Sequence, residues 1–109
     1  SFNPSMPPQF VGKDAHIVRA MISEGTMIFG TVENSVIFPG VRVAKGAVVR
    51  NSVLLPSARV AEGAVVDYAI LAQNVTVEAG AQVIGEQSQI AVIPEGETVT
   101  AAAGEQQVG

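Results

Sequence analysis

The segment VRVAKGAVVRNSVLLPS (residues 41–57) is followed at once by a near copy of itself, ARVAEGAVVDYAILAQN (residues 58–74). The two segments are identical at eight of their seventeen positions. The same spacing relates aliphatic residues beyond the pair, so the repeat extends along most of the chain. It generates three columns of aliphatic side chains, which are Val43/Val60/Val77, Val32/Val49/Val66/Val83 and Ile37/Leu54/Leu71. Columns of this kind indicate stacked coils that share one core.

A finer pattern divides each repeat into three short rungs. An aliphatic residue is followed four positions later by a small or β-branched residue, and six positions later by the next aliphatic residue. This spacing makes no helical stripe. Turn-forming residues recur at two corners, in columns that are Gly46/Gly63/Gly80 and Pro39/Pro56. The chain is therefore predicted to be an all-β, triangular parallel β-solenoid of about five coils. One early coil is shortened, because Ile17 and Val32 are only fifteen residues apart.

The composition fits many short strands packed on small side chains, with 48% apolar residues, 15% charged residues and no Trp. The absence of cysteine excludes a disulfide scaffold, a cysteine nucleophile and a thiolate metal site. A net charge of −4 with scattered basic residues argues against a nucleic-acid partner. The apolar runs are too short to span a membrane. We expect neither a metal site nor a bound cofactor in this chain.

Three segments are predicted along the chain. Several prolines precede the first coil and indicate a linker, while the regular spacing fails after Val83 and the segment IAVIPEGETVT (residues 90–100) indicates one or two closing strands. The last residues are small and polar, which favours disorder. The predicted division is a linker over residues 1–9, a solenoid over residues 10–100 and a disordered tail over residues 101–109.

Repeats of the form aliphatic-x-x-x-small-x are the hallmark of left-handed, single-stranded parallel β-helices, or hexapeptide-repeat proteins, and the predicted handedness rests on that resemblance. Three segments narrow the family: PPQFVGKDA (residues 7–15), ISEGTMIFGTVENSVIFPGVRVAKGAVVRNSVLLPSA (residues 22–58) and IAVIPEGETV (residues 90–99). With them the chain resembles the C-terminal domain of bacterial glucose-1-phosphate adenylyltransferase, also called ADP-glucose pyrophosphorylase. The resemblance covers roughly residues 7–99.

In that family an N-terminal nucleotidyltransferase domain converts ATP and glucose 1-phosphate to ADP-glucose and pyrophosphate for glycogen or starch synthesis. The β-helix supports tetramer assembly and allosteric control by a phosphorylated effector. The resemblance therefore implies a cytoplasmic protein whose partners are its own N-terminal catalytic domain and the other subunits of a homo- or hetero-tetramer. This chain would hold no catalytic residue, and Mg²⁺ would bind in the catalytic domain. Both a catalytic and a regulatory subunit fit the resemblance.

Two other classes remain open. Hexapeptide acyltransferases use a histidine base, and His16 is the only histidine here. Its position before the regular coils favours a surface residue instead. The other alternative is a structural β-helix, such as a non-catalytic regulatory subunit or the tail of another sugar nucleotidyltransferase relative.

Arg42 and Arg59 are seventeen residues apart, so the solenoid should stack them one coil above the other. Stacked like charges repel each other. One interpretation is that both side chains extend into water. The other is that the pair binds an anion, either an effector phosphate or a carboxylate of a neighbouring domain.

Other charged positions are predicted to form alternating columns. Glu33, Arg50 and Asp67 make one such column, and Lys45 above Glu62 makes another. We expect exposed ion pairs with little effect on stability from both columns.

Two outward faces are apolar, which is unusual for a free monomer. The sequence places Phe38 over Leu55 on one face, and the other carries small or branched residues, which are Ala44, Val48, Ala61 and Val65. We expect one of these faces to dock on the catalytic domain and the other on a second subunit.

Overall fold

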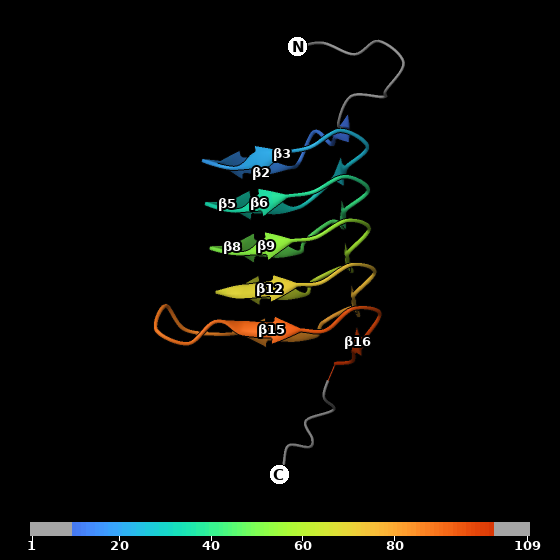
Figure 1. Ribbon diagram of the computed structural model, residues 1–109. Helices are drawn as coiled ribbons and strands as arrows, with labels where there is room; N and C mark the ends of the chain where they lie inside the picture. The colour runs from blue at the N-terminus through green and yellow to red at the C-terminus, as the bar shows by residue number, and fades with distance from the viewer. Residues whose placement is uncertain (1–9, 102–109) are drawn as a thin grey trace.

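The structure is a computed structural model that describes residues 10–101, and this part of the chain is a column of stacked coils built from short β-strands (Figure 1). Residues 10–101 contain no helix, which confirms the predicted all-β class. The predicted linker over residues 1–9 lies outside the described residues, and so does the predicted tail except for Ala101.

Sixteen strands in the described range form three parallel sheets, one on each side of a triangular coil. The first sheet contains β1 (Phe10–Val11), β4 (Met27–Ile28), β7 (Arg42–Val43), β10 (Arg59–Val60), β13 (Thr76–Val77) and β16 (Thr98–Val99). The second sheet contains β2 (His16–Val18), β5 (Thr31–Glu33), β8 (Val48–Arg50), β11 (Val65–Asp67) and β14 (Gln82–Ile84). The third sheet contains β3 (Met21–Ile22), β6 (Val36–Ile37), β9 (Val53–Leu54), β12 (Ala69–Leu71) and β15 (Ala91–Ile93).

Each strand pairs with the strand of the same sheet in the next coil. In the middle of the column the register is seventeen residues, and it pairs Val43 with Val60, Val49 with Val66 and Leu54 with Leu71. The second and third sheets have five strands each and the first has six. The column therefore contains five coils and one additional strand, which confirms the predicted number of coils.

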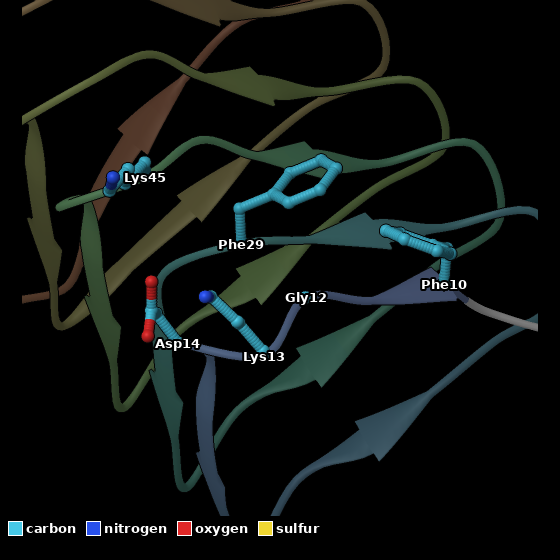
Figure 2. Close-up of a pocket in the computed structure, with 6 residues that line it drawn as sticks. All are labelled: Phe10, Gly12, Lys13, Asp14, Phe29 and Lys45. Carbon is cyan, nitrogen blue, oxygen red and sulfur yellow. The ribbon is translucent and has the colours of Figure 1, made fainter.

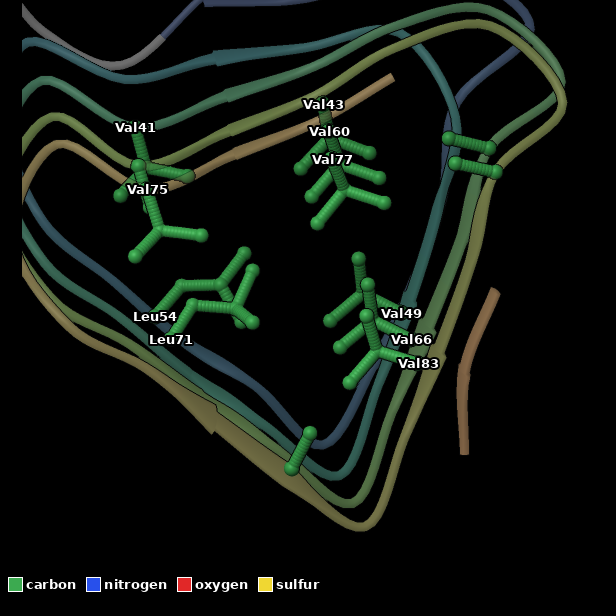
Figure 3. Close-up of a cluster of buried hydrophobic side chains, with 14 of the residues drawn as sticks. Val41, Val43, Val49, Leu54, Val60, Val66, Leu71, Val75, Val77 and Val83 are labelled. Carbon is green, nitrogen blue, oxygen red and sulfur yellow. The ribbon is translucent and has the colours of Figure 1, made fainter. Parts of the chain in front are cut away.

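The core is a set of vertical columns of aliphatic side chains that point into the triangle (Figure 3). Val43, Val49 and Leu54 each have an exposed fraction of 0%, and their counterparts in the next coil are buried equally well. Smaller residues fill the positions between them, including Ala47 and Ala64. Because every coil places similar side chains at equivalent positions, these side chains stack closely and fill the core with almost no aromatic residues.

Most turns between the sheets contain one residue whose backbone φ is positive. Between the first and second sheets of coils three to five it is Gly46, Gly63 or Gly80, with φ from 70° to 78°, as the glycine column predicted. Between the third and first sheets it is Gly25, Gly40, Ser57, Asn74 or Gly96. Between the second and third sheets it is Arg19, Asn34, Asn51 or Tyr68, with φ from 47° to 51°.

Two buried serines satisfy the backbone at the corner between the second and third sheets. The hydroxyl of Ser35 accepts a hydrogen bond from the Ser52 amide at 3.1 Å, and the hydroxyl of Ser52 accepts one from the Ala69 amide at 3.1 Å. Each hydroxyl also donates to a carbonyl oxygen of its own coil, that of Glu33 or Arg50. Both side chains are 4% exposed, so these bonds replace water that cannot reach the amides.

Two coils depart from the seventeen-residue length. The connection from β4 to β5 has only residues 29–30, whereas the coils on either side use residues 12–15 and 44–47. This places the predicted shortening at one corner. The last coil is longer, because Leu71 pairs with Ile93, and its additional residues form a loop between β14 and β15 that is closed by a bridge between Glu86 and Gln89.

The serine column generates a stability prediction. Ser52→Ala removes the acceptor of the buried Ala69 amide, and we expect it to lower the free energy of unfolding by about 1–3 kcal/mol. Urea unfolding of the whole chain measures this loss. Ser88→Ala in the exposed loop is the control and should be neutral. Equal unfolding midpoints for the two variants would contradict the role of the serine column.

Two glycines separate backbone strain from steric overlap. At Gly63 φ is 70° and no atom lies within 4 Å of an added Cβ, so Gly63→Ala should cost about 1 kcal/mol from strain alone. At Gly30 an added Cβ would lie 2.5 Å from the Ala47 carbonyl oxygen and 2.6 Å from that of Ala44. Gly30→Ala should therefore cost about 3 kcal/mol or more, because backbone atoms must move. Thermal unfolding of both variants tests the difference, and equal losses would show that the short corner is not tightly packed.

Candidate functional site

The predicted arginine pair lies on the outer side of the first sheet. Arg42 of β7 is in register with Arg59 of β10, and both side chains are exposed. The same outer column continues with Met27 on one side and Thr76 on the other. Within residues 10–101 neither arginine has a carboxylate within 4.0 Å. The structure therefore brings the two cations side by side without a carboxylate of the described chain to neutralise them.

The charged column on the second sheet forms only in part. Glu33, Arg50 and Asp67 are in register, and Arg50 Nη2 lies 3.4 Å from Asp67 Oδ2. The side-chain amide of Asn51 also donates to the other carboxylate oxygen of Asp67 at 3.0 Å. Glu33, however, approaches His16 rather than Arg50, with 4.0 Å between Oε2 and Nε2.

The prediction of an ion pair between Lys45 and Glu62 is wrong. Lys45 and Glu62 have no contact within 4.0 Å between their charged groups. Both residues occupy the exposed turn between the first and second sheets, just before Gly46 and Gly63. Their side chains extend into water, where an ion pair contributes too little to hold two long side chains in place.

The small apolar residues predicted for one outward face lie around a corner. Ala44 and Ala61 follow the strands of the first sheet, whereas Val48 and Val65 begin those of the second sheet. Phe38 and Leu55 follow β6 and β9, at the corner between the third and first sheets. All six side chains are half-buried against their own coils.

The sequence interpretation missed a longer apolar row on the third sheet. One outward position of this sheet is aliphatic in every coil and in register throughout; its residues are Met21, Val36, Val53, Ile70 and Val92. The row is exposed at both ends, with Met21 71% and Val92 61% exposed. The available signal was the residue immediately before each core aliphatic, but the six-residue division of the repeat placed that residue in the preceding rung.

The loop in the last coil adds a concave feature beside this row. A cavity of about 290 Å³ lies between the loop and the corner of the second and third sheets. Val36 and Val53 of the apolar row line one side, and Gln87 and Ile90 of the loop line the other, with Tyr68 at the corner. The cavity is open and mostly surrounded by neutral side chains.

His16 lies on the first coil, and its side chain is 65% exposed. No lining residue of the cavity beside the third sheet is a histidine. Among residues 10–101 no group of three His, Cys, Asp or Glu side chains is placed to hold a metal ion. The same residues include no helix long and apolar enough to cross a membrane.

Comparison with solved structures supports the fold. The acetyltransferase domain of PglB from Neisseria gonorrhoeae, in complex with acetyl coenzyme A, superimposes with a TM-score of 0.56 at 22% identity, over 87% of this chain and 55% of that chain. PerB from Caulobacter crescentus, in complex with CoA and GDP-perosamine, gives a TM-score of 0.54 at 12% identity, over 86% of this chain and 51% of that chain. At such identities the likeness concerns the fold alone.

Sequence comparison finds similar enzymes. A glucose-1-phosphate adenylyltransferase from Geobacillus stearothermophilus is 49% identical over 49 residues, and one from Clostridium perfringens is 55% identical over the same length. Each match covers 45% of this chain and 13% of the relative, so the matched segment spans about one eighth of those proteins.

The family comparison covers most of the chain. Residues 6–99 match the model described as GlmU-like, C-terminal hexapeptide. The parallel sheets and repeated coils are consistent with the predicted left-handed β-helix of hexapeptide repeats. The chain belongs to the GlmU-like C-terminal hexapeptide family.

Proposed function

We propose that this chain is the C-terminal assembly and regulatory domain of a glucose-1-phosphate adenylyltransferase, which converts ATP and glucose 1-phosphate to ADP-glucose and pyrophosphate. The observation that carries the proposal is the 49% and 55% identity to two enzymes of that name. The chain itself is non-catalytic in this proposal. Its only histidine is exposed, and within residues 10–101 the charged side chains lie in surface columns or turns rather than around one reacting centre.

The proposed division of labour places the chemistry in an N-terminal nucleotidyltransferase domain. ATP, glucose 1-phosphate and Mg²⁺ would bind there, in the cytoplasm, and the product would feed glycogen synthesis. The solenoid supplies a rigid column, because its coils are linked by backbone hydrogen bonds such as that from the Val48 amide to the Ala64 carbonyl oxygen at 2.9 Å. A rigid column can hold catalytic domains at fixed positions in a tetramer.

The outer faces of the column are the proposed contact surfaces. The apolar row on the third sheet is five coils long and includes no charged residue. The corner carrying Phe38 and Leu55 lies at one edge of that sheet. We assign this side to the catalytic domain of the same polypeptide, because the row and the corner beside it form the longer of the two apolar surfaces. The corner with Val48 and Val65 is then assigned to a second subunit.

The arginine pair is the proposed effector site. The two guanidinium groups are exposed on adjacent strands, and no carboxylate of residues 10–101 lies within 4.0 Å of them. Together they can donate several hydrogen bonds to one phosphate group. A sugar phosphate is the effector class that this arrangement favours. Its binding would relieve the repulsion between the guanidinium groups, and this gain exists only in the bound state.

A hexapeptide acyltransferase is the second candidate function, and the likeness to PglB and PerB is the observation that favours it. The placement of His16 argues against it. The imidazole Nε2 is 4.0 Å from the nearest carboxylate oxygen, that of Glu33, which is too long for the hydrogen bond that orients a catalytic base. Acetyl coenzyme A binding therefore separates the two candidates.

The proposed reaction is tested with the longest natural polypeptide that contains this chain. We expect it to form ADP-glucose from ATP and glucose 1-phosphate, either alone or with a catalytic partner subunit, while the 109-residue chain forms none. Chromatographic detection of ADP-glucose measures the product. Formation of a different sugar nucleotide would contradict the substrate assignment, and saturable binding of acetyl coenzyme A to the chain would favour an acyltransferase.

The effector site is tested by removing both charges. In the same long polypeptide we expect Arg42→Ala/Arg59→Ala to weaken binding of a sugar phosphate about tenfold or more, because two charge-assisted hydrogen bonds are lost. Isothermal titration calorimetry measures the affinity. Arg50→Gln removes a positive charge that is already paired with Asp67 and is the matched control. Unchanged affinity in the double variant would exclude the arginine pair as the effector site.

A further inference from the structure

The shortened corner leaves a notch in the side of the column. Coils one and three turn from the first sheet to the second with four residues each, whereas coil two turns with residues 29–30 alone. The chain of coil two therefore lies deeper than its neighbours, and Gly30 is buried beneath the turn of coil three. A cavity of about 290 Å³ opens at this height between the turns of coils one and three.

The inner wall of the notch is aromatic. The ring of Phe29 lies across Gly12, whose missing side chain makes room for it, because a Cβ on Gly12 would be 2.8 Å from Phe29 Cδ1. The ring of Phe10 follows, with 5.5 Å between the two ring centroids and 52° between the ring planes. Two tilted rings side by side offer an aromatic ligand both a face and an edge.

The rim of the notch is charged. Lys13, Asp14 and Lys45 line it, and Lys13 and Lys45 are the only two lysines of the chain. Their charged groups lie on one side of Phe29, opposite Phe10 (Figure 2). Among the described residues none of the three forms an ion pair within 4.0 Å. The rim therefore has two ammonium groups, one carboxylate and a net charge of +1.

We propose that this notch binds a small molecule in which an aromatic ring bears one phosphate or carboxylate group. The ring packs on Phe29 and Phe10, and the anionic group lies between the ammonium groups of Lys13 and Lys45. The notch has a charged side and an aromatic side, which correspond to the anionic group and the ring of such a ligand. The volume is at the lower limit of small-molecule pockets, so a single substituted ring is the size that fits.

Because Asp14 and the lysines carry opposite charges, the proposal predicts opposite changes in affinity when each charge is removed. Its carboxylate lies on the same rim as the lysines and repels an anion placed there. Lys45→Gln should weaken binding about two- to fivefold, and Asp14→Asn should strengthen it by a similar factor, as for single charges near a surface. A pocket that binds only apolar molecules would respond to neither change.

The experiment titrates phenyl phosphate into the ¹⁵N-labelled 109-residue chain and follows the backbone amides of Gly12, Gly30 and Lys45 by NMR. We expect saturable shifts, and at least fivefold weaker binding of benzyl alcohol, which has no anionic group, and of inorganic phosphate, which has no ring. Gly12→Ala pushes the Phe29 ring into the notch without changing any charge. It should weaken phenyl phosphate binding and leave the response to inorganic phosphate unchanged.

Arg50→Gln is the matched charge control, because it removes one positive charge outside the notch. It should leave the affinity for phenyl phosphate within twofold of the unmodified chain. Three outcomes overturn the proposal: no saturable shifts with phenyl phosphate, equal affinity for inorganic phosphate, or affinities of Lys45→Gln and Asp14→Asn that change in the same direction.

Discussion

Everything in this structure depends on the in-register stacking of one coil on the next. Every coil contributes amides and carbonyl oxygens to hydrogen bonds with its neighbours, as between the Arg42 amide and the Ala58 carbonyl oxygen at 3.1 Å. A shift by one residue would turn Val43 or Leu54 to the outside and place a polar side chain in the core. The register therefore requires the same inward side chains at equivalent positions of every strand, whereas the length of a coil can change at its corners.

This constraint explains why the fold is predictable from sequence. Columns such as Val49/Val66 are required in every coil, so they appear as identities seventeen residues apart. Gly46 and Gly63 recur because the turn after the first sheet has a positive φ at this position in coils three to five. The corner after the second sheet has the same requirement, but there it is met by Asn34 and by Asn51. Asparagine is also an ordinary surface residue, so that column does not stand out in the sequence.

The outer surface is less predictable, because no coil requires a particular outward side chain. The register of Arg42 and Arg59 follows from the repeat and is confirmed. The repeat does not predict which charged side chains form ion pairs. Among the described residues Lys45 and Glu62 form none, because their long side chains are flexible and no other contact fixes them. The apolar row was missed for another reason: Val53 is outward-facing although it directly precedes the buried Leu54, and composition alone does not distinguish the two.

Departures from the repeat are therefore where this fold acquires concave surfaces. A regular solenoid has flat sides, because each column of outward side chains keeps the same position from coil to coil. Two missing residues at the corner of Phe29 open a notch, and the additional residues around Gln87 build a wall beside the third sheet. Both changes lie in turns, where the core columns are unaffected: Val32 and Val83, close to the two irregular turns, remain 0% and 5% exposed. Because the core columns tolerate length changes only at corners, the corners are where a solenoid of this kind can gain binding sites without losing stability.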